Sequence, residues 1–335
     1  MLWWLSPGDP ERRTGGFIYN ARVIDAMRAQ GHRVRVLRLD AEWPFPDRID
    51  GREQLPDIPD GDTVVADGLM WTGLPEDDRV ALTSRCSVWV VVHSPLDMEG
   101  GGPAVAKRER EALQCARGWW ATSESTARLM AGRLRADSCH CITPGTEVSA
   151  QAGDRSPQRL LSVAHVIRRK GHDRLFDALA GLQDLEWELS IVGSSQVDPE
   201  WAVGLRTRAQ ELGIAGRLTW LETLEEEALR QTMARHGLLV HPARYEAYGM
   251  VLTEALASGL PVLSTEAGAL VGLESAAVMH LPSSGDPLEW SEVLRSWLTD
   301  KPRQHEASIA AASLQWPSWD EQARRLAALL AMPEV

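Results

Sequence analysis

The sequence predicts an α/β protein made of two domains with parallel sheets. Its 335 residues exceed the size that a single hydrophobic core usually serves. Short apolar runs, such as residues 88–92, alternate with segments of helical spacing, as expected for strands buried between helices. Hydrophobic residues make up 44% of the chain, which is enough for two packed cores.

Composition and charge narrow the functional classes. The net charge of −12 and the pI of about 5.3 argue against a nucleic-acid partner, which favours a basic face. No stretch approaches the length of a transmembrane helix, and the N-terminus lacks the regions of a signal peptide. The cysteines show no metal-ligand spacing and are interpreted as reduced thiols, which predicts a cytoplasmic protein. They are Cys86, Cys115, Cys139 and Cys141.

The first domain is predicted at residues 1–150 and a linker at 151–158. Strands are expected at 2–5, 34–39, 63–66, 88–92 and 119–122, and a helix at 17–30. Gly15 and Gly16 lie in the loop between the first strand and that helix. They form either a bare tight turn or a ligand-binding loop. The pattern is not the full G-x-G-x-x-G fingerprint, so it does not indicate NAD.

His93 directly follows the apolar strand predicted at 88–92. Ligands of α/β proteins bind at the carboxyl ends of strands. On position alone, His93 is therefore either a ligand-binding residue or a structural histidine that caps the strand.

The second domain is predicted at residues 158–312 and opens with a strand at 160–164. Arg168, Arg169 and Lys170 follow this strand. Fixed cations at a strand end suit a diphosphate, because Arg clamps phosphate with two donors and Lys acts as a point charge. The alternative is a solvated basic loop.

Residues 240–259 combine a strand end, a loop and a helix start, with the sequence VHPARYEAYGMVLTEALASG. Gly249 lets a ligand approach the backbone, and the helix N-terminus offers free N–H groups to an anion. Glu254 lies more than one turn into the helix, where its carboxylate suits a ribose diol. Glu246 would then lie at the sugar end of the same ligand. The alternative is two surface glutamates on an amphipathic helix.

The run PARYEAYGMVLTEALASGLPV resembles the signature of the retaining GT-B glycosyltransferases, glycosyltransferase family four, or group 1 glycosyltransferases. The segments TGGFIYNARVIDAMRAQGHRVRVL, VVVHSPL, ATSESTARL, CITPGTE and RRKGHD are similar to the same family, so the resemblance covers most of the chain. It implies a GT-B architecture with two facing Rossmann-like domains. Residues 313–335 would form a C-terminal helix that crosses back to the N-terminal, acceptor-side domain.

The implied activity is retaining transfer of a hexose from a nucleotide-diphosphate sugar to an acceptor hydroxyl on a sugar, lipid or small molecule. No Asp-x-Asp stands in a convincing metal position, so no essential metal is expected, and no cofactor is expected besides the nucleotide-diphosphate sugar that serves as donor substrate. The resemblance assigns Lys170 to the donor phosphates and places His93 and Glu246 beside the donor sugar. The nucleotide base is expected at the loops of Gly193 and Glu222-Thr223. The donor-binding set implied by the resemblance is Gly15, Gly16, Arg168, Arg169, Lys170, Ala247, Tyr248, Gly249, Met250 and Glu254.

Two positions depart from the family pattern. His165 stands where the family commonly has Arg, so Arg168 or Arg169 would supply the second cation. Ala247 stands where the family often has Gly, and its methyl group would narrow donor choice. Two other functions stay open: a nucleotide-sugar epimerase on a GT-B scaffold, and a non-catalytic nucleotide-sugar-binding protein.

Overall fold

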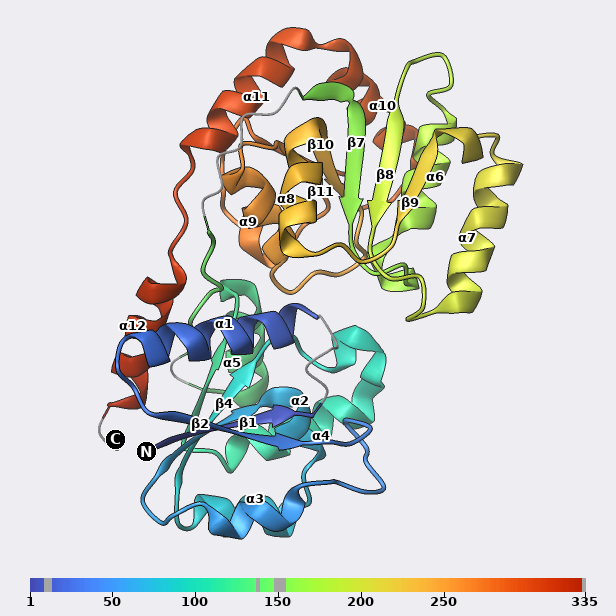
Figure 1. The fold of residues 1–335 in the computed structure, drawn as a ribbon. Helices are drawn as coiled ribbons and strands as arrows, with labels where there is room; N and C mark the ends of the chain where they lie inside the picture. Colours follow the sequence, from blue (N-terminus) through green and yellow to red (C-terminus); the bar gives the residue numbers. More distant parts are fainter. Residues whose placement is uncertain (9–13, 137–138, 148–154, 333–335) are drawn as a thin grey trace. The chain divides into compact units, whose positions relative to one another are not determined.

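The chain folds into two compact units in the computed structural model (Figure 1). The structure describes all residues except 9–13, 137–138, 148–154 and 333–335. The first unit comprises Met1–Gly145 and Pro317–Val335, and the second comprises Thr146–Trp316. Residues 151–154 of the linker predicted at 151–158 lie outside the described residues, and residues 156–158 already belong to strand β7 (Ser156–Val163), which corrects the predicted end of the linker. None of the helices in the described ranges combines the length and apolar character that a membrane crossing needs.

The first unit contains a six-stranded sheet in the order β2-β1-β3-β4-β5-β6, and all its strand pairs are parallel. Because the order reverses beside β1, the carboxyl ends of β1 and β3 flank the place where doubly wound sheets bind ligands. The strands are β1 (Leu2–Pro7), β2 (Val34–Leu39), β3 (Thr63–Asp67), β4 (Ser87–Val92), β5 (Gly118–Ala121) and β6 (His140–Cys141).

Helices cover this sheet, and the first one begins earlier than predicted. Helix α1 starts at Gly15, with Thr14 as N-cap, and the Ile18 N–H donates to the Thr14 carbonyl at 3.1 Å. Gly15 and Gly16 are therefore helical and not part of a loop, which corrects the predicted helix start at residue 17. The helical elements are α1 (Gly15–Ala29), η1 (Arg52–Asp57), α2 (Gly68–Gly73), α3 (Glu76–Thr83), η2 (Asp97–Gly101), α4 (Gly102–Gln114) and α5 (Glu124–Leu134).

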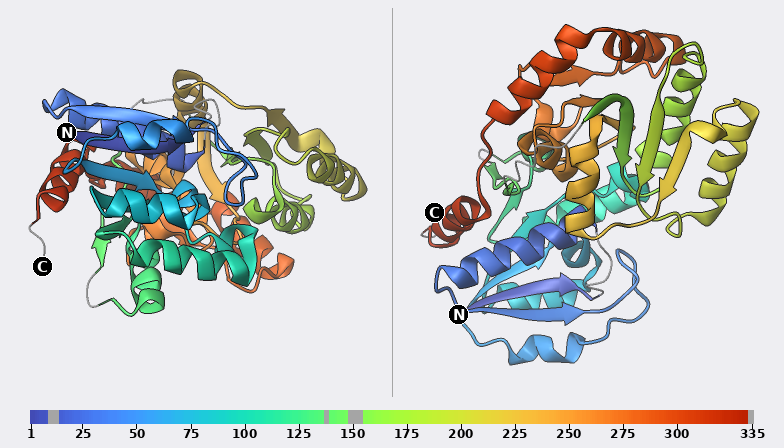
Figure 2. Two further views of the ribbon diagram at one scale, coloured as in Figure 1. Left: turned by 90° about the horizontal axis from the view of Figure 1, so that it is seen from below. Right: turned by 45° about the horizontal axis from the view of Figure 1, so that its top comes forward.

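The last helix, α12 (Trp319–Leu330), belongs to the first unit. It lies beside α1 in both views of Figure 2, and the rings of Trp319 and Tyr19 meet edge to face at 5.8 Å. Leu326 and Leu329 join the same buried cluster as Tyr19. Ser318 and Glu321 form a capping box that fixes the helix start. The expected return of the C-terminal helix to the N-terminal domain is confirmed.

The second unit contains another six-stranded parallel sheet, in the order β12-β11-β10-β7-β8-β9. All six residues of β10 are buried, which explains their nearly continuous apolar run. The order reverses between β7 and β10, so the loops after these two strands define the ligand-binding edge. The strands are β7 (Ser156–Val163), β8 (Glu188–Val192), β9 (Leu218–Leu221), β10 (His236–His241), β11 (Val262–Ser264) and β12 (Val278–His280).

Helices pack on both faces of this sheet (Figure 1). The elements are η3 (Arg168–Lys170), α6 (His172–Ala180), α7 (Pro199–Glu211), η4 (Ala215–Arg217), α8 (Glu226–Arg235), α9 (Met250–Ala257), η5 (Gly268–Leu270), α10 (Pro287–Thr299) and α11 (Lys301–Ser313).

Candidate functional site

In the second unit, the turn after β7 packs closely against the loop after β10. Gly171 lies between η3 and α6 at φ +72°, and a Cβ there would sit 2.0 Å from the Pro242 carbonyl oxygen. Any larger residue would force the two loops apart, so glycine is required. The Arg244 N–H donates to the Arg169 carbonyl at 2.8 Å across the same junction. The two segments singled out in the sequence thus form one site.

A buried ionic cluster lies at this junction. The Lys170 Nζ lies 2.5 Å from the Glu246 Oε2, and the His241 Nε2 lies 3.0 Å from the same oxygen. The Lys170 and Glu246 side chains are only 13% and 14% exposed. Burial alone would raise the pKa of Glu246, but the charge of Lys170 and the hydrogen bond from His241 outweigh it and hold that pKa well below its usual range. Glu246 is therefore a carboxylate at neutral pH.

Among the residues that the structure describes, donors reach only one oxygen of Glu246. Within the described residues, Oε2 receives both donors and Oε1 receives no side-chain or backbone hydrogen bond. Gly249, the N-cap of α9, has φ +89°, and a Cβ there would lie 2.7 Å from the Leu252 Cδ1 and 3.2 Å from the Glu246 Cγ. A carboxylate with one fixed and one open oxygen is suited to accept a hydrogen bond from a ligand hydroxyl.

The three basic residues of η3 have different surroundings. Lys170 pairs with Glu246, whereas Arg168 and Arg169 contact other residues. The Arg168 guanidinium lies 5.6 Å from the centre of the Trp201 ring, and the Arg169 Nη1 donates to the Tyr245 carbonyl at 3.1 Å. Each guanidinium is thus held by a residue outside η3.

Arg244 supplies a further positive charge that the sequence analysis did not identify. Its guanidinium clamps Asp173 with bonds of 2.8 and 2.6 Å and also donates to the Arg168 carbonyl at 2.7 Å. This ion pair ties the β10 loop to the start of α6. Because Asp173 neutralises Arg244, the pair fixes the loop and adds little net charge.

The other predicted donor-binding residues follow Glu246 in the chain. Ala247 and Tyr248 are buried, and the Tyr248 carbonyl accepts from the Ala269 N–H at 2.9 Å. Met250 is the first residue of α9 and Glu254 the fifth, and both are partly exposed. The structure places Glu254 about one helical turn from the helix start, as the sequence predicts.

The loops predicted to meet the nucleotide base are linked by hydrogen bonds. The Glu222 carboxylate accepts from the Ser195 backbone N–H at 3.0 Å and from its hydroxyl at 2.6 Å. Gly193 has φ +144°, and a Cβ there would lie 2.1 Å from the Ala164 carbonyl oxygen. The loops after β7, β8 and β9 are therefore held together at the same edge of the sheet.

His172 is a buried histidine beside this cluster. It is 0% exposed, and neither ring nitrogen has a hydrogen-bond partner among the described residues. Burial lowers its pKa to about 4, and the neighbouring His241 and Lys170 side chains act in the same direction. His172 is therefore neutral at pH 7.

In the first unit, His93 is held by two polar residues that the sequence analysis did not identify as partners. The His93 Nε2 lies 3.1 Å from the Asn20 Oδ1 and 3.2 Å from the Asp67 Oδ2. Both neighbours are acceptors, so Nε2 carries a hydrogen. Nδ1 receives no hydrogen bond from the described residues and is the nitrogen left for a ligand.

The Asp67 carboxylate anchors this arrangement. It is 4% exposed, and it accepts from the Asn20 Nδ2 at 2.8 Å and the Leu69 N–H at 3.0 Å. Burial acts to raise the pKa of Asp67, but the hydrogen bonds from His93, Asn20 and Leu69 keep it below its ordinary value. The signal in the sequence was Asp67-Gly68 at the end of a buried strand adjacent to β4.

Gly16 and Tyr19 of α1 complete the surroundings of His93. A Cβ at Gly16 would lie 3.0 Å from the His93 Cδ2, so the glycine makes room for the imidazole. The Tyr19 ring meets the His93 ring edge to face at 5.3 Å, and its hydroxyl donates to the Ile142 carbonyl at 3.0 Å. The structure thus brings Gly16 to His93.

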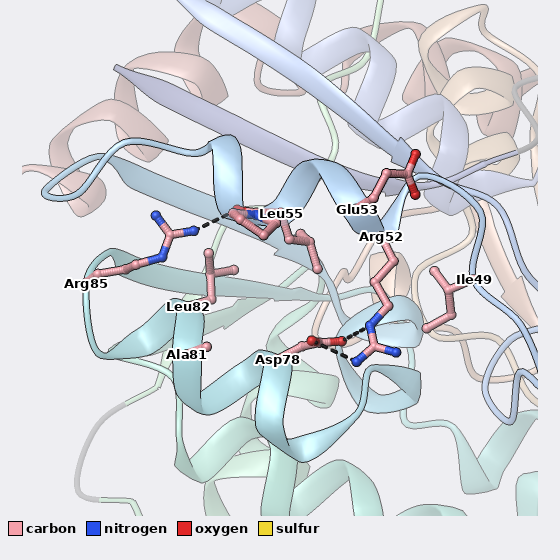
Figure 3. Close-up of a pocket in the computed structure, with 9 residues that line it drawn as sticks. Ile49, Arg52, Glu53, Leu55, Asp78, Ala81, Leu82 and Arg85 are labelled. Carbon is pink, nitrogen blue, oxygen red and sulfur yellow. Dashed lines mark hydrogen bonds and ion pairs between the residues drawn. The ribbon is translucent and has the colours of Figure 1, made fainter.

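A separate hollow of about 540 Å³ lies in the first unit between η1 and α3 (Figure 3). Arg52 pairs there with Asp78 at 2.6 Å, and Arg85 donates to the Leu55 carbonyl at 2.6 Å. Arg52, Asp78 and Arg85 thus have partners within the protein, and the lining includes none of the predicted site residues.

Comparison with known proteins gives the family. The family model described as "Glycosyl transferases group 1" matches residues 147–314, half of the chain. A D-inositol 3-phosphate glycosyltransferase of Catenulispora acidiphila is 30% identical over 216 residues, which cover 57% of this chain and 50% of that protein. The lipopolysaccharide glucosyltransferase WaaG of Escherichia coli is 34% identical over 148 residues, or 43% of this chain and 38% of WaaG. The chain thus spans about half the length of the curated relatives it matches, or less.

Solved structures share the fold over nearly the whole chain. Anabaena HepE, solved with UDP and glucose, aligns with a TM-score of 0.80 at 16% identity and covers 98% of this chain and 99% of its own. Sucrose-phosphate synthase from Thermosynechococcus elongatus aligns with a TM-score of 0.78 at 18% identity, covering 98% and 97%. These likenesses confirm the two-domain GT-B fold predicted from the sequence.

Proposed function

The chain belongs to the group 1 glycosyltransferases, and on this premise we propose that it transfers a hexose from a nucleotide-diphosphate sugar to an acceptor hydroxyl, with retention of configuration. The observation that supports this most is the cluster of Lys170, Glu246 and His241 at the switch point of the second unit. It offers a cation for a phosphate and a half-open carboxylate for a sugar hydroxyl.

The donor is proposed to lie along the β7 and β10 loops. Lys170 binds the diphosphate, with Arg168 or Arg169 as the second cation in place of the family arginine at His165. The open Glu246 Oε1 accepts from a sugar hydroxyl, and Glu254 accepts from the ribose hydroxyls. The N-terminal turn of α9 turns its free N–H groups toward the phosphates.

The proposed reaction requires no protein nucleophile. The acceptor oxygen forms a bond to the anomeric carbon while the bond from that carbon to the diphosphate oxygen breaks. The acceptor proton passes to the leaving diphosphate on the same face. Lys170 stabilises the growing negative charge on the diphosphate, and Glu246 stabilises the positive charge that develops on the sugar. His93 is proposed to contact the donor sugar through Nδ1. We propose that no metal is essential, and activity in the presence of EDTA tests this.

The names of similar proteins bear on the choice of donor and acceptor. HepE was solved in complex with UDP-glucose, and the names of the curated relatives describe transfer to an inositol phosphate and to lipopolysaccharide. These names favour a hydroxylated acceptor. An epimerase would convert the donor without any acceptor, and a binding protein would leave it unchanged.

A two-step experiment tests the function. UDP-, GDP-, ADP- and dTDP-glucose are first screened by thermal shift, since a ligand at 100 times its dissociation constant adds about 2.7 kcal/mol of stability. The best donor is then incubated with an acceptor panel, and the anomeric configuration of the product is determined by NMR.

We expect turnover that depends on acceptor and is lost in Glu246→Gln but not in Glu274→Gln, a change at an exposed glutamate. Conversion of the donor without acceptor would support the epimerase. Binding without any conversion would support the binding protein.

A further inference from the structure

The cluster in the second unit contains a histidine that the proposed mechanism leaves unused. We propose that, when the donor binds, Lys170 moves from Glu246 to the diphosphate. His241 then takes up a proton, and the resulting imidazolium of His241 keeps Glu246 in place. His241 is thus a positioning residue that acts through Glu246. The inference rests on the proposed function, because it requires an anionic donor at Lys170.

The geometry shows that two donors share one acceptor. Lys170 and His241 both approach the Glu246 Oε2, at 2.5 and 3.0 Å. A diphosphate carries more negative charge than one carboxylate, so it competes strongly for the lysine ammonium. When Lys170 leaves, His241 is the partner that remains on Oε2.

The two donors differ in freedom to move. Lys170 has a flexible four-carbon arm, which can turn toward a ligand without backbone movement. His241 is the last residue of β10 and is 1% exposed, and its carbonyl accepts from the Thr265 N–H at 3.2 Å. The imidazole therefore stays in place when the lysine turns away.

Charge explains why this exchange moves a proton. Without donor, burial lowers the pKa of His241, and the cations Lys170 and Arg169 of η3 oppose its protonation. Glu246 favours it, and His172 of α6 faces the same cluster as a neutral ring. Pairing of Lys170 with the diphosphate removes the nearest repulsion and leaves Glu246 without its ammonium. Both changes favour protonation of His241.

Protonation keeps the site ordered for the transfer step. The imidazolium neutralises Glu246 and fixes Oε2, so Oε1 stays directed to the sugar while Lys170 holds the diphosphate. A neutral imidazole would leave an uncompensated buried carboxylate, which is costly.

Calorimetry without acceptor tests the inference. The probe is UDP-glucose, or whichever of the four screened donors gives the largest thermal shift, since its diphosphate is doubly esterified and does not titrate near pH 7. The binding enthalpy is measured at pH 7 in buffers of different ionisation enthalpy, and the slope gives the number of protons taken up. We expect net uptake of a fraction of one proton by the wild-type protein.

Variants identify the group that takes up the proton. His241→Gln keeps an N–H donor but does not titrate, so the slope should fall to zero. Glu246→Gln should also abolish the uptake and serves as a second route if His241→Gln does not fold. His236→Gln, at the opposite end of β10, should keep the wild-type slope.

The outcomes separate the two levels of the proposal. Donor binding without proton uptake, or an unchanged slope in His241→Gln, overturns the role of His241 and leaves the proposed function standing. Failure of all four donors to bind contradicts the proposed function itself.

Discussion

The two units place a carboxylate and an imidazole at the carboxyl ends of their strands, but they use them in opposite ways. In the first unit, both oxygens of the Asp67 carboxylate accept hydrogen bonds, and no described residue bonds to the His93 Nδ1. In the second unit, His241 is buried, and no described residue bonds to the Glu246 Oε1. The same pair of groups thus leaves an imidazole nitrogen available to a ligand in one unit and a carboxylate oxygen in the other.

The difference follows from the third partner in each cluster. Asn20 bridges Asp67 and His93 with its amide and adds no charge. Lys170 brings a full positive charge to Glu246. The first arrangement is stable without a ligand, whereas the second contains a cation that an anionic ligand can recruit.

The largest expected effect separates Glu246 from Glu254. Glu246→Gln should lower kcat about 10²- to 10³-fold without weakening nucleotide binding, because the charge of Glu246 acts on the transition state. Glu254→Gln should weaken donor and nucleoside diphosphate alike, by roughly 1–3 kcal/mol, and should appear mainly in KM. Turnover and calorimetric binding measure both. The reverse pattern would exchange the two assignments.

Asp67→Asn tests the closed cluster of the first unit. In one orientation, the new amide would turn its NH₂ group toward the donors of Asn20 and His93. In the other, it would turn the NH₂ group toward the Leu69 N–H and lose that hydrogen bond. We expect unfolding to become easier by roughly 3 kcal/mol, because buried polar groups lose their acceptor. Urea denaturation measures this. Asp25→Asn, at an exposed position of α1, is the control and should change stability little. Equal effects of the two variants would contradict the anchoring role of Asp67.

Glu109 of α4 should make stability fall as the pH rises. Its side chain is 2% exposed, Oε1 accepts from the Leu96 N–H at 3.3 Å, and burial raises its pKa from 4.5 to about 7. The folded state therefore binds more protons than the unfolded state between pH 4.5 and 7, and stability is lost across that window. Glu109→Gln keeps an acceptor for Leu96 and should gain about 2 kcal/mol at pH 8. A gain of the same size at pH 4.5 would contradict this explanation.

His172 should make the stability of the second unit depend on pH in the opposite direction. Because its folded pKa is lowered from 6.5 to about 4, the unfolded state binds more protons in that window. Stability is therefore complete above pH 6.5 and falls as the pH drops. His172→Leu should gain about 1–2 kcal/mol at pH 5 and less at pH 8, as measured by thermal unfolding at both pH values. An equal gain in stability at pH 5 and pH 8 would mean that the substitution acts through packing and not through the pKa of His172.

The sequence predicted the elements with strong periodicity and missed those without it. The strand and helix around Glu246, the turn around Lys170 and the returning terminal helix were all recognised. Helices α2, α3 and α11 were not, because α2 is six residues bounded by glycines and α3 and α11 are mostly polar or alanine. Their helical state depends on caps and packing that only the folded chain reveals.

The partners within each cluster could not be predicted from spacing. His241 ends an apolar strand, so its sequence position indicates a core residue. Asn20 lies in a helix 73 positions from His93, and no local pattern joins them. The sequence indicates which strand ends carry polar side chains. Only the folded structure shows which of these side chains bond to the same carboxylate oxygen.

The return of α12 to the first unit has a consequence for how the chain is made. The second unit is one continuous stretch, Thr146–Trp316, and all of it leaves the ribosome before α12 does. The buried cluster of Tyr19 and Ile24 is completed by Leu326 and Leu329, which are synthesised about three hundred residues later. The first unit is thus begun first and completed last. Until α12 has been synthesised, the apolar face of α1 lacks the helix that covers it in the folded protein and is open to aggregation.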